Sequence, residues 1–509
     1  MALLGKREEE DFQNRGVLLA TGKSWRGLRA ACEPLFKQGA LESYAPTINQ
    51  AMDGLSGRLA MVSSKGKSIN MSEALAGMTF DVIGRTAFGV NFDTSGSGKH
   101  SEAVTAAQTV FRPPRDTNPW ISIMALLVPD LKVLWGWLAV WLGSVRVGAI
   151  SEAQMYVYGL SQQLLDNARR ATEGKQASAA VEKRPQPAED GKQAQATSQE
   201  KPAAVGSAAT IRLVANATAA GNSRAAGSAA DGEVAQQAKH GPVSAAKQPI
   251  ASGMEWAQSQ AFERARRLYR DTIPAANSVI HTLRSTKDSK TGGPLSDLDI
   301  CSQAYTLLLA GYETTSTALG YMMFEVAKSP ELQERLRQEV EGLGLSPGAP
   351  LGFEHLQQLP LLEATFFEAL RMYPPVTALV ALMRQPHEPS RVGKYAIPAE
   401  SRVMMNVWAL HHDPLRFPEP QQCRPERFLA DSQENSQRHP YAYIPFGVGP
   451  RKCLGHRLAR EEAVLAVARL LLQFDFSLNS QRHKGPLDLS SALTLSPRGG
   501  IWLNAVARV

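Results

Sequence analysis

One apolar segment, residues 298–327, limits the folds open to this chain more than any other feature of its sequence. It is long enough for a helix of about eight turns, and its apolar residues occupy all sides of the helical wheel. A helix of this kind is stable in water only when other elements cover it on every side. The sequence therefore predicts a large domain built around one central, buried helix.

Most of the other patterned segments are helical as well. Apolar residues recur at helical spacing over residues 24–36, 44–62, 74–89, 329–342, 361–372 and 453–472. Two short runs, 394–397 and 402–407, are strand-like. The predicted fold class is mainly α with small β-sheets.

The composition changes sharply after Arg170. Residues 171–255 are rich in alanine and poor in large apolar side chains, and no Phe, Trp or Tyr occurs between Tyr158 and Trp256. Such a segment buries too little apolar surface to offset its ordering entropy, which indicates a disordered insert. An alanine-rich helix is the alternative. We therefore expect residues 1–170 and 256–509 to form one domain that this insert interrupts.

Charge and cysteine content exclude several classes of protein. The chain has 55 Lys and Arg against 48 Asp and Glu, a net charge of +7. That small excess fits a basic docking face better than a nucleic-acid-binding surface, so no nucleic-acid partner is expected. The cysteines, Cys32, Cys301, Cys423 and Cys453, form no CxxC pair. A disulfide framework and a zinc ribbon are therefore both excluded.

The sequence gives two indications about membranes. The first residues carry a short apolar tip and then a charge cluster, which predicts neither a signal peptide nor an anchor there. Residues 118–147 are rich in Trp and Leu, but Pro129, Asp130 and Lys132 interrupt them, so neither apolar part can span a bilayer. The tryptophans suit a segment that dips into one leaflet. A buried helical hairpin explains the same pattern equally well.

The residues with most chemical information lie at 446–455, with the sequence FGVGPRKCLG. This is a glycine-rich loop that ends on Cys453 next to a predicted helix, whose free N–H groups should lower the pKa of the thiol. Gly447 permits a tight turn, and Gly455 leaves room for a flat ligand. Arg451 offers a cation to an acidic group of such a ligand.

This loop, which begins at Phe446, resembles the haem-binding loop of the cytochrome P-450 family, F-G-x-G-x-R-x-C-x-G, at every defined position. Three more family motifs follow the family's order: A-G-x-[DE]-T at 310–314, E-x-x-R at 368–371 and P-E-R-F at 425–428. The resemblance extends from about Leu18 to the C-terminus, apart from the insert. Its details are most similar to the microsomal drug- and steroid-oxidising branch that also contains thromboxane synthase.

The resemblance implies haem b as the cofactor. Cys453 would be the axial thiolate ligand of the haem iron, in a loop formed by Phe446, Gly447 and Gly455. The indole of Trp25 and the guanidiniums of Arg29 and Arg451 would hold the haem propionates. The chain departs from the family pattern at Ala381, where an arginine is usual. Arg384 is the candidate replacement.

Two further groups of residues receive roles from the resemblance. Glu313 and Thr314 would lie on the distal side of the haem and deliver protons to bound dioxygen. Gly311 would open the central helix there. A buried hydroxyl bonded to the preceding turn is the alternative for Thr314. Glu368, Arg371 and Arg427 would form a buried structural triad that holds the loop before Cys453.

Substrate and electrons must both come from outside the chain. Ala304, Leu308 and residues 376–382 and 493–494 would contact a hydrophobic substrate, although each is also explained as plain core. No flavin- or nicotinamide-binding fingerprint occurs, so an NADPH-dependent flavoprotein reductase is the expected electron donor, with cytochrome b5 as a second candidate. Basic residues expected on one face would attract it; they are Lys23, Arg26, Lys37, Lys452, Arg457 and Arg460. A simply solvated face is the alternative.

By the resemblance, the protein is expected to be a haem-thiolate monooxygenase on the cytosolic face of the endoplasmic reticulum membrane. The family's leading strands and first helices have no counterpart before Leu18, so we expect an N-terminally truncated fold with an exposed strand edge near Val403. Two other functions stay open: an oxygen-independent isomerase of a peroxide or epoxide, and a truncated haem-binding protein without turnover. The Glu313–Thr314 pair favours the monooxygenase over the isomerase.

Overall fold

The computed structural model describes residues 15–97, 102–111, 147–182, 260–275, 278–288, 291–377, 383–491 and 494–508. The chain divides into two compact units, Met1–Gln176 with Ile250–Val509, and Ala177–Pro249. Ala381, residues 118–146 and most of the predicted insert lie outside the described residues. The predictions made for them stay predictions.

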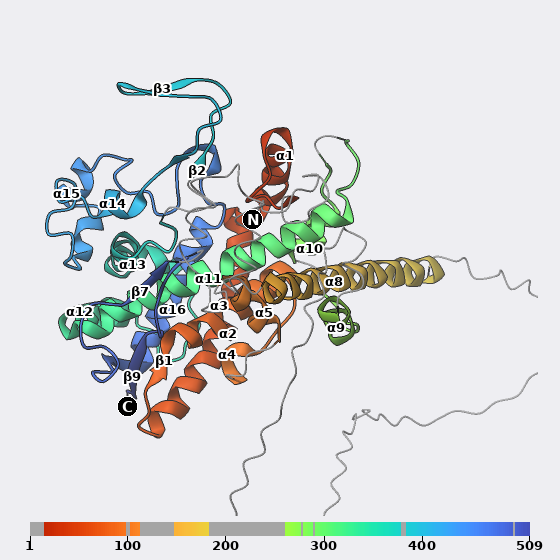
Figure 1. The fold of residues 1–509 in the computed structure, drawn as a ribbon. Coiled ribbons are helices and arrows are strands. Elements are labelled where there is room, and N and C mark those ends of the chain that lie inside the picture. Colours follow the sequence, from red (N-terminus) through yellow and green to blue (C-terminus); the bar gives the residue numbers. More distant parts are fainter. Residues whose placement is uncertain are drawn as a thin grey trace, which may run out of the picture. The chain divides into compact units, whose positions relative to one another are not determined.

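The described part of the first unit is mainly helical (Figure 1). Its helices are α1 (Gly22–Cys32), η2 (Glu33–Phe36), α2 (Gln38–Ser64), α3 (Met71–Ile83), η3 (Gly84–Phe88), α4 (Thr94–Ser97), α5 (Glu102–Phe111), α8 (Val147–Glu182), α9 (Gln260–Leu268), α10 (Val279–Arg284), α11 (Asp297–Lys328), α12 (Pro330–Glu341), η6 (Phe353–Gln358), α13 (Pro360–Met372), α14 (Val407–His411), η7 (Pro425–Phe428), α15 (Gln433–Gln437), η8 (Gly449–Arg451) and α16 (His456–Gln473).

The strands are short and form small antiparallel sheets. They are β1 (Ile69–Asn70), β2 (Met383–Arg384), β3 (Ser390–Val392), β4 (Tyr395–Ile397), β5 (Val403–Met404), β6 (Phe474–Leu478), β7 (Leu489–Ser491), β8 (Leu495–Pro497) and β9 (Trp502–Ala507). The sheets have the orders β1-β9-β6, β2-β5, β3-β4 and β7-β8. The predicted fold class, mainly α with small β-sheets, is confirmed.

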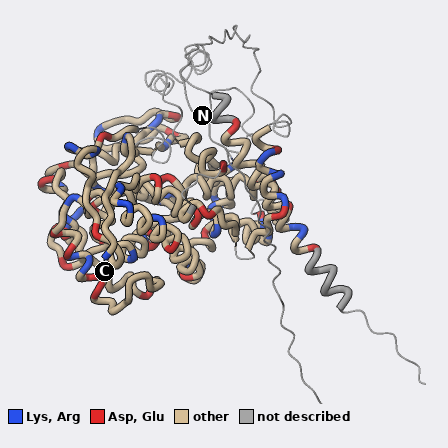
Figure 2. Tube along the Cα trace, turned by 90° about the horizontal axis from the view of Figure 1, so that it is seen from below, with Lys and Arg blue, Asp and Glu red and all other residues tan. Residues whose placement is uncertain are grey.

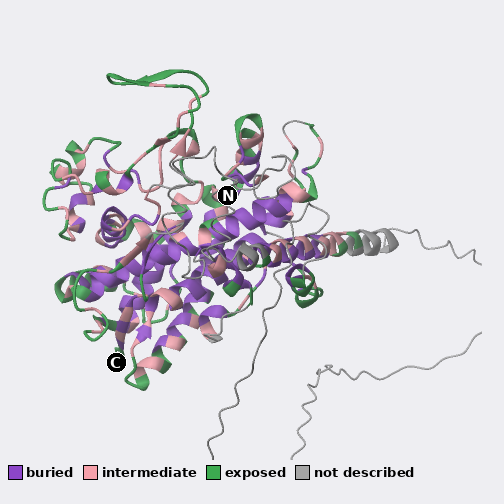
Figure 3. Cartoon of the chain, viewed as in Figure 1, coloured by how far each residue is buried: buried purple, intermediate pink, exposed green. Residues whose placement is uncertain are grey.

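Helix α11 is the central helix that the sequence predicted. The Ser296 side chain caps its N-terminus by accepting a hydrogen bond from the Asp299 N–H. Every residue from 300 to 309 and from 315 to 327 is buried, and Figure 3 draws most of the helix in the colour of buried residues. Helices α3, α13 and α16 pack against it.

Two hydrophobic clusters share this helix. One joins the C-terminal half of α11 to α2, α3, α12, α13 and α16. The other joins its N-terminal half to α1, α5, α8 and α10. Because segments from both ends of the sequence pack on α11, the two halves that flank the predicted insert belong to one folded unit.

Several predicted boundaries differ from the structure, among them those near the insert, the second strand-like run and the cysteine loop. Helix α8 continues beyond the predicted boundary at residue 171 to Glu182, as the helix propensity of alanine allows. The predicted strand 402–407 ends at Met404, because the Asn406 side chain caps α14 by accepting from the Ala409 N–H. Helix α16 begins at His456, three residues after Cys453.

Charge is mixed over this unit. Figure 2 shows basic and acidic residues interspersed along the described chain. In the part of the chain that the structure describes, we found no helix with the length and hydropathy needed to span a bilayer.

One acidic residue of α16 is buried without compensation. Glu462 is 4% exposed, and within the described residues its Oε1 atom has no hydrogen-bond partner. Burial raises the pKa of this carboxyl to about 8. The group is therefore protonated at neutral pH in the folded protein.

Replacing Glu462 with glutamine is expected to stabilise the protein at pH 8 by roughly 2–4 kcal/mol. The folded-state pKa is raised above the unfolded value, so the wild-type protein loses stability as the pH rises from about 4.5 to about 8. Glutamine does not titrate, and its advantage at pH 5 should be under about 1 kcal/mol. Urea unfolding at the two pH values measures the difference. An equal gain at both would contradict the assignment.

Candidate functional site

The loop from Phe446 to Cys453 folds back on itself. The Cys453 N–H donates to the Phe446 carbonyl at 2.9 Å, and the Lys452 N–H donates to the Gly449 carbonyl at 3.0 Å. Gly447 and Gly449 both have φ of +71°, in the left-handed region where glycine carries no penalty. The two glycines thus allow the turn that returns the chain to Cys453.

The surroundings of Cys453 differ from those of the other cysteines. Cys32 and Cys301 are buried, and burial raises the pKa of each thiol. Cys453 is accessible to solvent, yet the protein around it still raises its pKa by desolvation, and the Gly455 N–H, Arg29 and Lys452 oppose that effect. The net direction is opposite to the one predicted from the sequence, because desolvation outweighs these donors.

A short accessible strip interrupts the buried surface of α11. Ala310 is exposed, and Gly311 and Thr314 are half-buried, although every residue on either side of this turn is buried. The Thr314 hydroxyl donates to the Ala310 carbonyl at 2.6 Å, which is the alternative bond that the sequence left open. Glu313 is fully buried.

The structure corrects the expectation for Gly311. Helix α11 is unbroken α-helix through this residue, so Gly311 does not open it. A side chain at this position would meet the Ile83 side chain at 3.0 Å. The glycine therefore allows α3 to approach the central helix closely.

Two arginines and an indole gather beside the cysteine loop. The Arg451 guanidinium lies 4.3 Å from the Trp25 ring centroid, and that of Arg29 lies 5.8 Å from it. Arg29 also donates to the Lys452 carbonyl at 2.9 Å, and Arg451 to the Ala20 carbonyl at 2.7 Å. These bonds attach α1 and the segment before it to the loop.

The arginines disfavour one another. Desolvation, Arg384 and Arg29 lower the pKa of Arg451, and no carboxylate is among the groups that act on it. An anionic ligand beside Arg451 would offset this repulsion, whereas Arg29 is already paired with Glu33 at 3.3 Å. The electrostatics also place Arg384, the candidate replacement for the arginine expected at Ala381, near Arg451.

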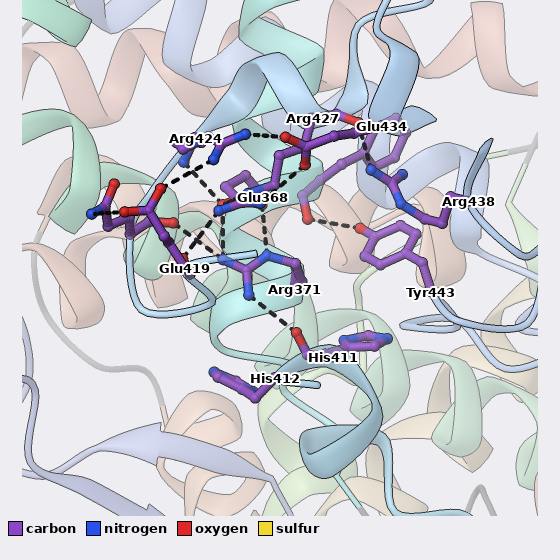
Figure 4. A network of polar contacts seen from close by, with 12 residues as sticks. Glu368, Arg371, His411, His412, Glu419, Arg424, Arg427, Glu434, Arg438 and Tyr443 are labelled. Carbon is purple, nitrogen blue, oxygen red and sulfur yellow. Dashed lines mark hydrogen bonds and ion pairs between the residues drawn. The ribbon is translucent and has the colours of Figure 1, made fainter. Parts of the chain in front are cut away.

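The structure brings Glu368, Arg371 and Arg427 together (Figure 4), and all three are fully buried. Both oxygens of Glu368 accept from Arg371, at 2.7 and 2.8 Å. One of them also accepts from Arg427 at 3.3 Å and from the Arg424 N–H at 2.9 Å. A buried carboxylate thus carries two guanidiniums, with its lone pairs satisfied.

Sequence reasoning missed the outer part of this network. Glu434 accepts from Arg427 at 3.0 Å and also pairs with Arg424, and Arg438 donates to the Arg427 carbonyl. Tyr443 donates to the Phe367 carbonyl at 2.8 Å. Glu434 lies in the short helix α15, and Arg424, Arg438 and Tyr443 lie in segments without helical or strand periodicity, so no pattern pointed to them.

His411 connects the triad with the cysteine loop. Its carbonyl accepts from Arg371 at 3.1 Å, and its Nε2 atom accepts from the Ile444 N–H at 2.9 Å. Burial and the neighbouring Arg371 lower the pKa of its ring to about 3, so the ring stays neutral and keeps its acceptor. The segment that leads to Phe446 is thereby fixed to the triad.

Comparison with known proteins decides the family. The cytochrome P450 family model matches residues 4–172 and 257–504. The chain belongs to the cytochrome P450 family. The match passes over residues 173–256, the greater part of the predicted insert.

Three relatives illustrate the similarity. The chain is 35% identical over 243 residues to mouse cytochrome P450 4V2, which covers 47% of this chain and 45% of that relative. It is 25% identical over 497 residues to dog cytochrome P450 3A12, and this match covers 98% of this chain and 76% of that relative. It is 36% identical over 215 residues to thromboxane-A synthase of Macaca fascicularis, and this match covers 42% of this chain and 39% of that relative. The family and the branch predicted from the sequence are confirmed.

Family membership indicates a haem-dependent monooxygenase, an oxidoreductase whose cofactor is haem b. The described residues fit this group on three observations. Cys453 is an accessible thiol in a glycine loop, the arginines around Trp25 suit two propionates, and the strip at Ala310–Thr314 leaves one accessible turn on a buried helix.

Proposed function

We propose that this protein inserts one oxygen atom from O2 into a hydrophobic organic substrate, with electrons from a separate NADPH-dependent flavoprotein reductase. The balanced reaction is RH + O2 + NADPH + H⁺ → ROH + H2O + NADP⁺. Bound haem would supply the activation of oxygen. The observation that carries the proposal is the accessible turn of α11 that presents Thr314.

Thr314 is the residue proposed to handle protons. Its hydroxyl hydrogen is donated to the Ala310 carbonyl, so the Oγ lone pairs remain to accept a hydrogen bond from water on the accessible side. That water would be held at Oγ and oriented for proton transfer. Glu313, buried at the next position, is the acid proposed to supply protons to this turn.

The remaining site residues are proposed to hold the cofactor. The Cys453 sulfur would ligate the iron, and the loop residues Phe446, Gly447 and Gly455 would lie beside the ring. Trp25, Arg29 and Arg451 would bind the propionates, the arginines as charge-assisted donors. The observation in favour of Arg384 as a fourth contributor is its electrostatic effect on Arg451.

The reductase is proposed to dock on the basic residues of α1, α16 and the loops beside them. Lys23, Arg26, Lys37, Lys452 and Arg457 are exposed. Burial lowers the pKa of His456 most, and Lys452, Arg457 and Arg460 each lie close enough to this ring to lower it further. Arg460 also pairs with Glu363 at 3.0 Å. A patch of this charge attracts an acidic partner. Cytochrome b5 is the second candidate donor.

A hydrophobic substrate fits the apolar surface of α11. Ala304 and Leu308 are fully buried there, and Thr494, the described residue of the predicted 493–494 turn, is buried as well.

We also propose the cytosolic face of the endoplasmic reticulum membrane as the location, with residues 118–147 in contact with the lipid surface.

Replacing Thr314 with alanine is expected to uncouple the reaction. Without the Oγ atom that holds the water, product formed per NADPH should fall about tenfold and hydrogen peroxide should rise. The assay uses the haem-loaded protein, a flavoprotein reductase and a set of O-alkyl resorufin probes.

Thr315→Ala is the matched control, since Thr315 is buried on the same helix. It should leave the product-to-NADPH ratio near the wild-type value. Turnover of a lipid hydroperoxide or an epoxide that needs neither O2 nor NADPH, without conversion of the resorufin probes, would contradict the monooxygenase and support the isomerase. Unchanged coupling in Thr314→Ala would remove Thr314 from the mechanism.

A further inference from the structure

A polar pocket of about 280 Å³ opens between α2, η3 and the segment before α10. It shares no lining residue with the cysteine loop or with the accessible turn of α11. Its volume is below the roughly 300–1,000 Å³ of pockets for drug-sized ligands, so it suits a small ligand. Its lining includes Thr47, Gln50, Arg85, Gly89, Asn91 and Ala275.

The close approach of two segments forms one wall of this pocket. Gly89 follows η3 with φ of +69°, and the Ala275 N–H donates to its carbonyl at 3.3 Å. A side chain at Gly89 would clash with the backbone of Ala275. The glycine therefore lets the segment before α10 lie directly against the end of η3.

Arg85 is the charged residue of the lining. Its Nε atom donates to the side-chain oxygen of Asn91 at 3.2 Å, and its Nη1 atom donates to that of Gln50. Both acceptors are neutral amides. Within the described residues these are the hydrogen bonds of its side chain, so the N–H groups of Nη2 remain for a ligand.

The protein compensates the charge of Arg85 only in part. Burial lowers the pKa of Arg85, and the carboxylates of Asp81 and Asp93 oppose this effect without reversing it. Both oxygens of Asp81 already accept hydrogen bonds from Thr94 and Ser95. Asp93 is exposed, where solvent and salt screen its charge. An anionic ligand beside Arg85 would stabilise the charged guanidinium.

The other polar groups of the lining favour a phosphate over a carboxylate. Gln50 and Asn91 accept from Arg85 through their amide oxygens, which leaves the NH2 group of each to donate. The Thr47 hydroxyl is a further donor. These donors come from α2 and from the segment after η3, on different sides of the pocket. A phosphate group accepts through three oxygens in different directions, whereas a carboxylate has two oxygens in one plane.

We propose that this pocket binds a phosphate group, either as free phosphate or as part of a small metabolite. Arg85 provides the positive charge through the N–H groups of Nη2. Thr47, Gln50 and Asn91 provide neutral donors around the phosphate oxygens. The pocket is separate from the proposed oxidation site, and the proposal does not rest on the chemistry of that site.

The test is isothermal titration calorimetry of the full-length, haem-loaded protein in a phosphate-free buffer, with inorganic phosphate and with ribose 5-phosphate. We expect saturable binding with a Kd at or below about 1 mM. Tighter binding of the ester would support a metabolite as the ligand, and equal binding would support free phosphate. A wild-type protein that binds neither compound would overturn the proposal. Acetate or ribose that binds as tightly as ribose 5-phosphate would overturn it as well.

Variants of Arg85 show whether the binding occurs in this pocket. Arg85→Gln should weaken phosphate binding about tenfold, because it removes the charge. Arg85→Lys keeps the charge but loses the planar fork, and it should weaken binding about threefold. Because Arg85 bonds only to two exposed amide side chains, both variants should keep the wild-type circular dichroism.

Arg58→Gln is the matched control. Arg58 is a half-buried arginine of α2 that pairs with Glu73 at 3.8 Å and lies outside the lining of the pocket. This variant should bind phosphate as tightly as the wild type. Wild-type affinity in Arg85→Gln, or equal losses in Arg58→Gln and Arg85→Gln, would overturn the proposal.

Discussion

Replacing Glu368 with alanine is expected to destabilise the folded protein by about 3–5 kcal/mol. Glu368 is the carboxylate that neutralises Arg371 and Arg427, and all three side chains are fully buried. Its removal leaves the buried Arg371 guanidinium without its carboxylate and leaves Arg427 with Glu434 alone. A loss of this size is a large fraction of the stability of a typical protein, so little soluble haem-loaded protein should form.

Glu363→Ala is the matched control on the same helix. Glu363 pairs with Arg460 at 3.0 Å, but both side chains are about one-third exposed, and a pair of this kind contributes about 0–1 kcal/mol. Urea unfolding of the two variants measures the difference between a buried and an exposed ion pair on α13. If Glu368→Ala stays within about 1 kcal/mol of the wild type, the triad does not hold this part of the fold.

The elements that the sequence predicted well depend on local patterns. The range predicted from the all-apolar segment, 298–327, lies within one residue of the bounds of α11 at each end. The Ser-Pro pair at 329–330 correctly predicted the start of α12. The E-x-x-R spacing places Glu368 and Arg371 on one helical face, where the structure has them 2.7 Å apart. In each case the interacting residues lie within one helix, so periodicity alone is sufficient.

Contacts between distant loops could not be predicted in this way. His411 of α14 meets Ile444, and Glu434 of α15 meets Arg427 of η7, because the chain between α14 and α16 folds back beside α13. The effect of Arg384 on Arg451 likewise joins segments without a common period. The pKa of Cys453 depends on how much protein surrounds the thiol, which the motif does not specify.

Replacing Cys453 with alanine is expected to abolish the thiolate signature of the bound haem. Cys453 is the accessible thiol of the glycine loop, while Cys32 and Cys301 are buried in the core. The carbon monoxide difference spectrum of the reduced wild-type protein should show a strongly red-shifted Soret band. The band should be absent in Cys453→Ala, and haem content should fall severalfold, because the arginines around Trp25 still attract the propionates but no longer act with an axial ligand.

Cys301→Ala is the control for the loss of a thiol as such. It removes a buried sulfur from α11 at a cost of about 1 kcal/mol and should keep the red-shifted band. Circular dichroism of both variants separates loss of the ligand from loss of the fold, since Cys453 is accessible and alanine removes only its sulfur. A red-shifted band that persists in Cys453→Ala would mean that another residue ligates the iron. A wild-type protein that takes up no haem would contradict the proposed oxidation chemistry.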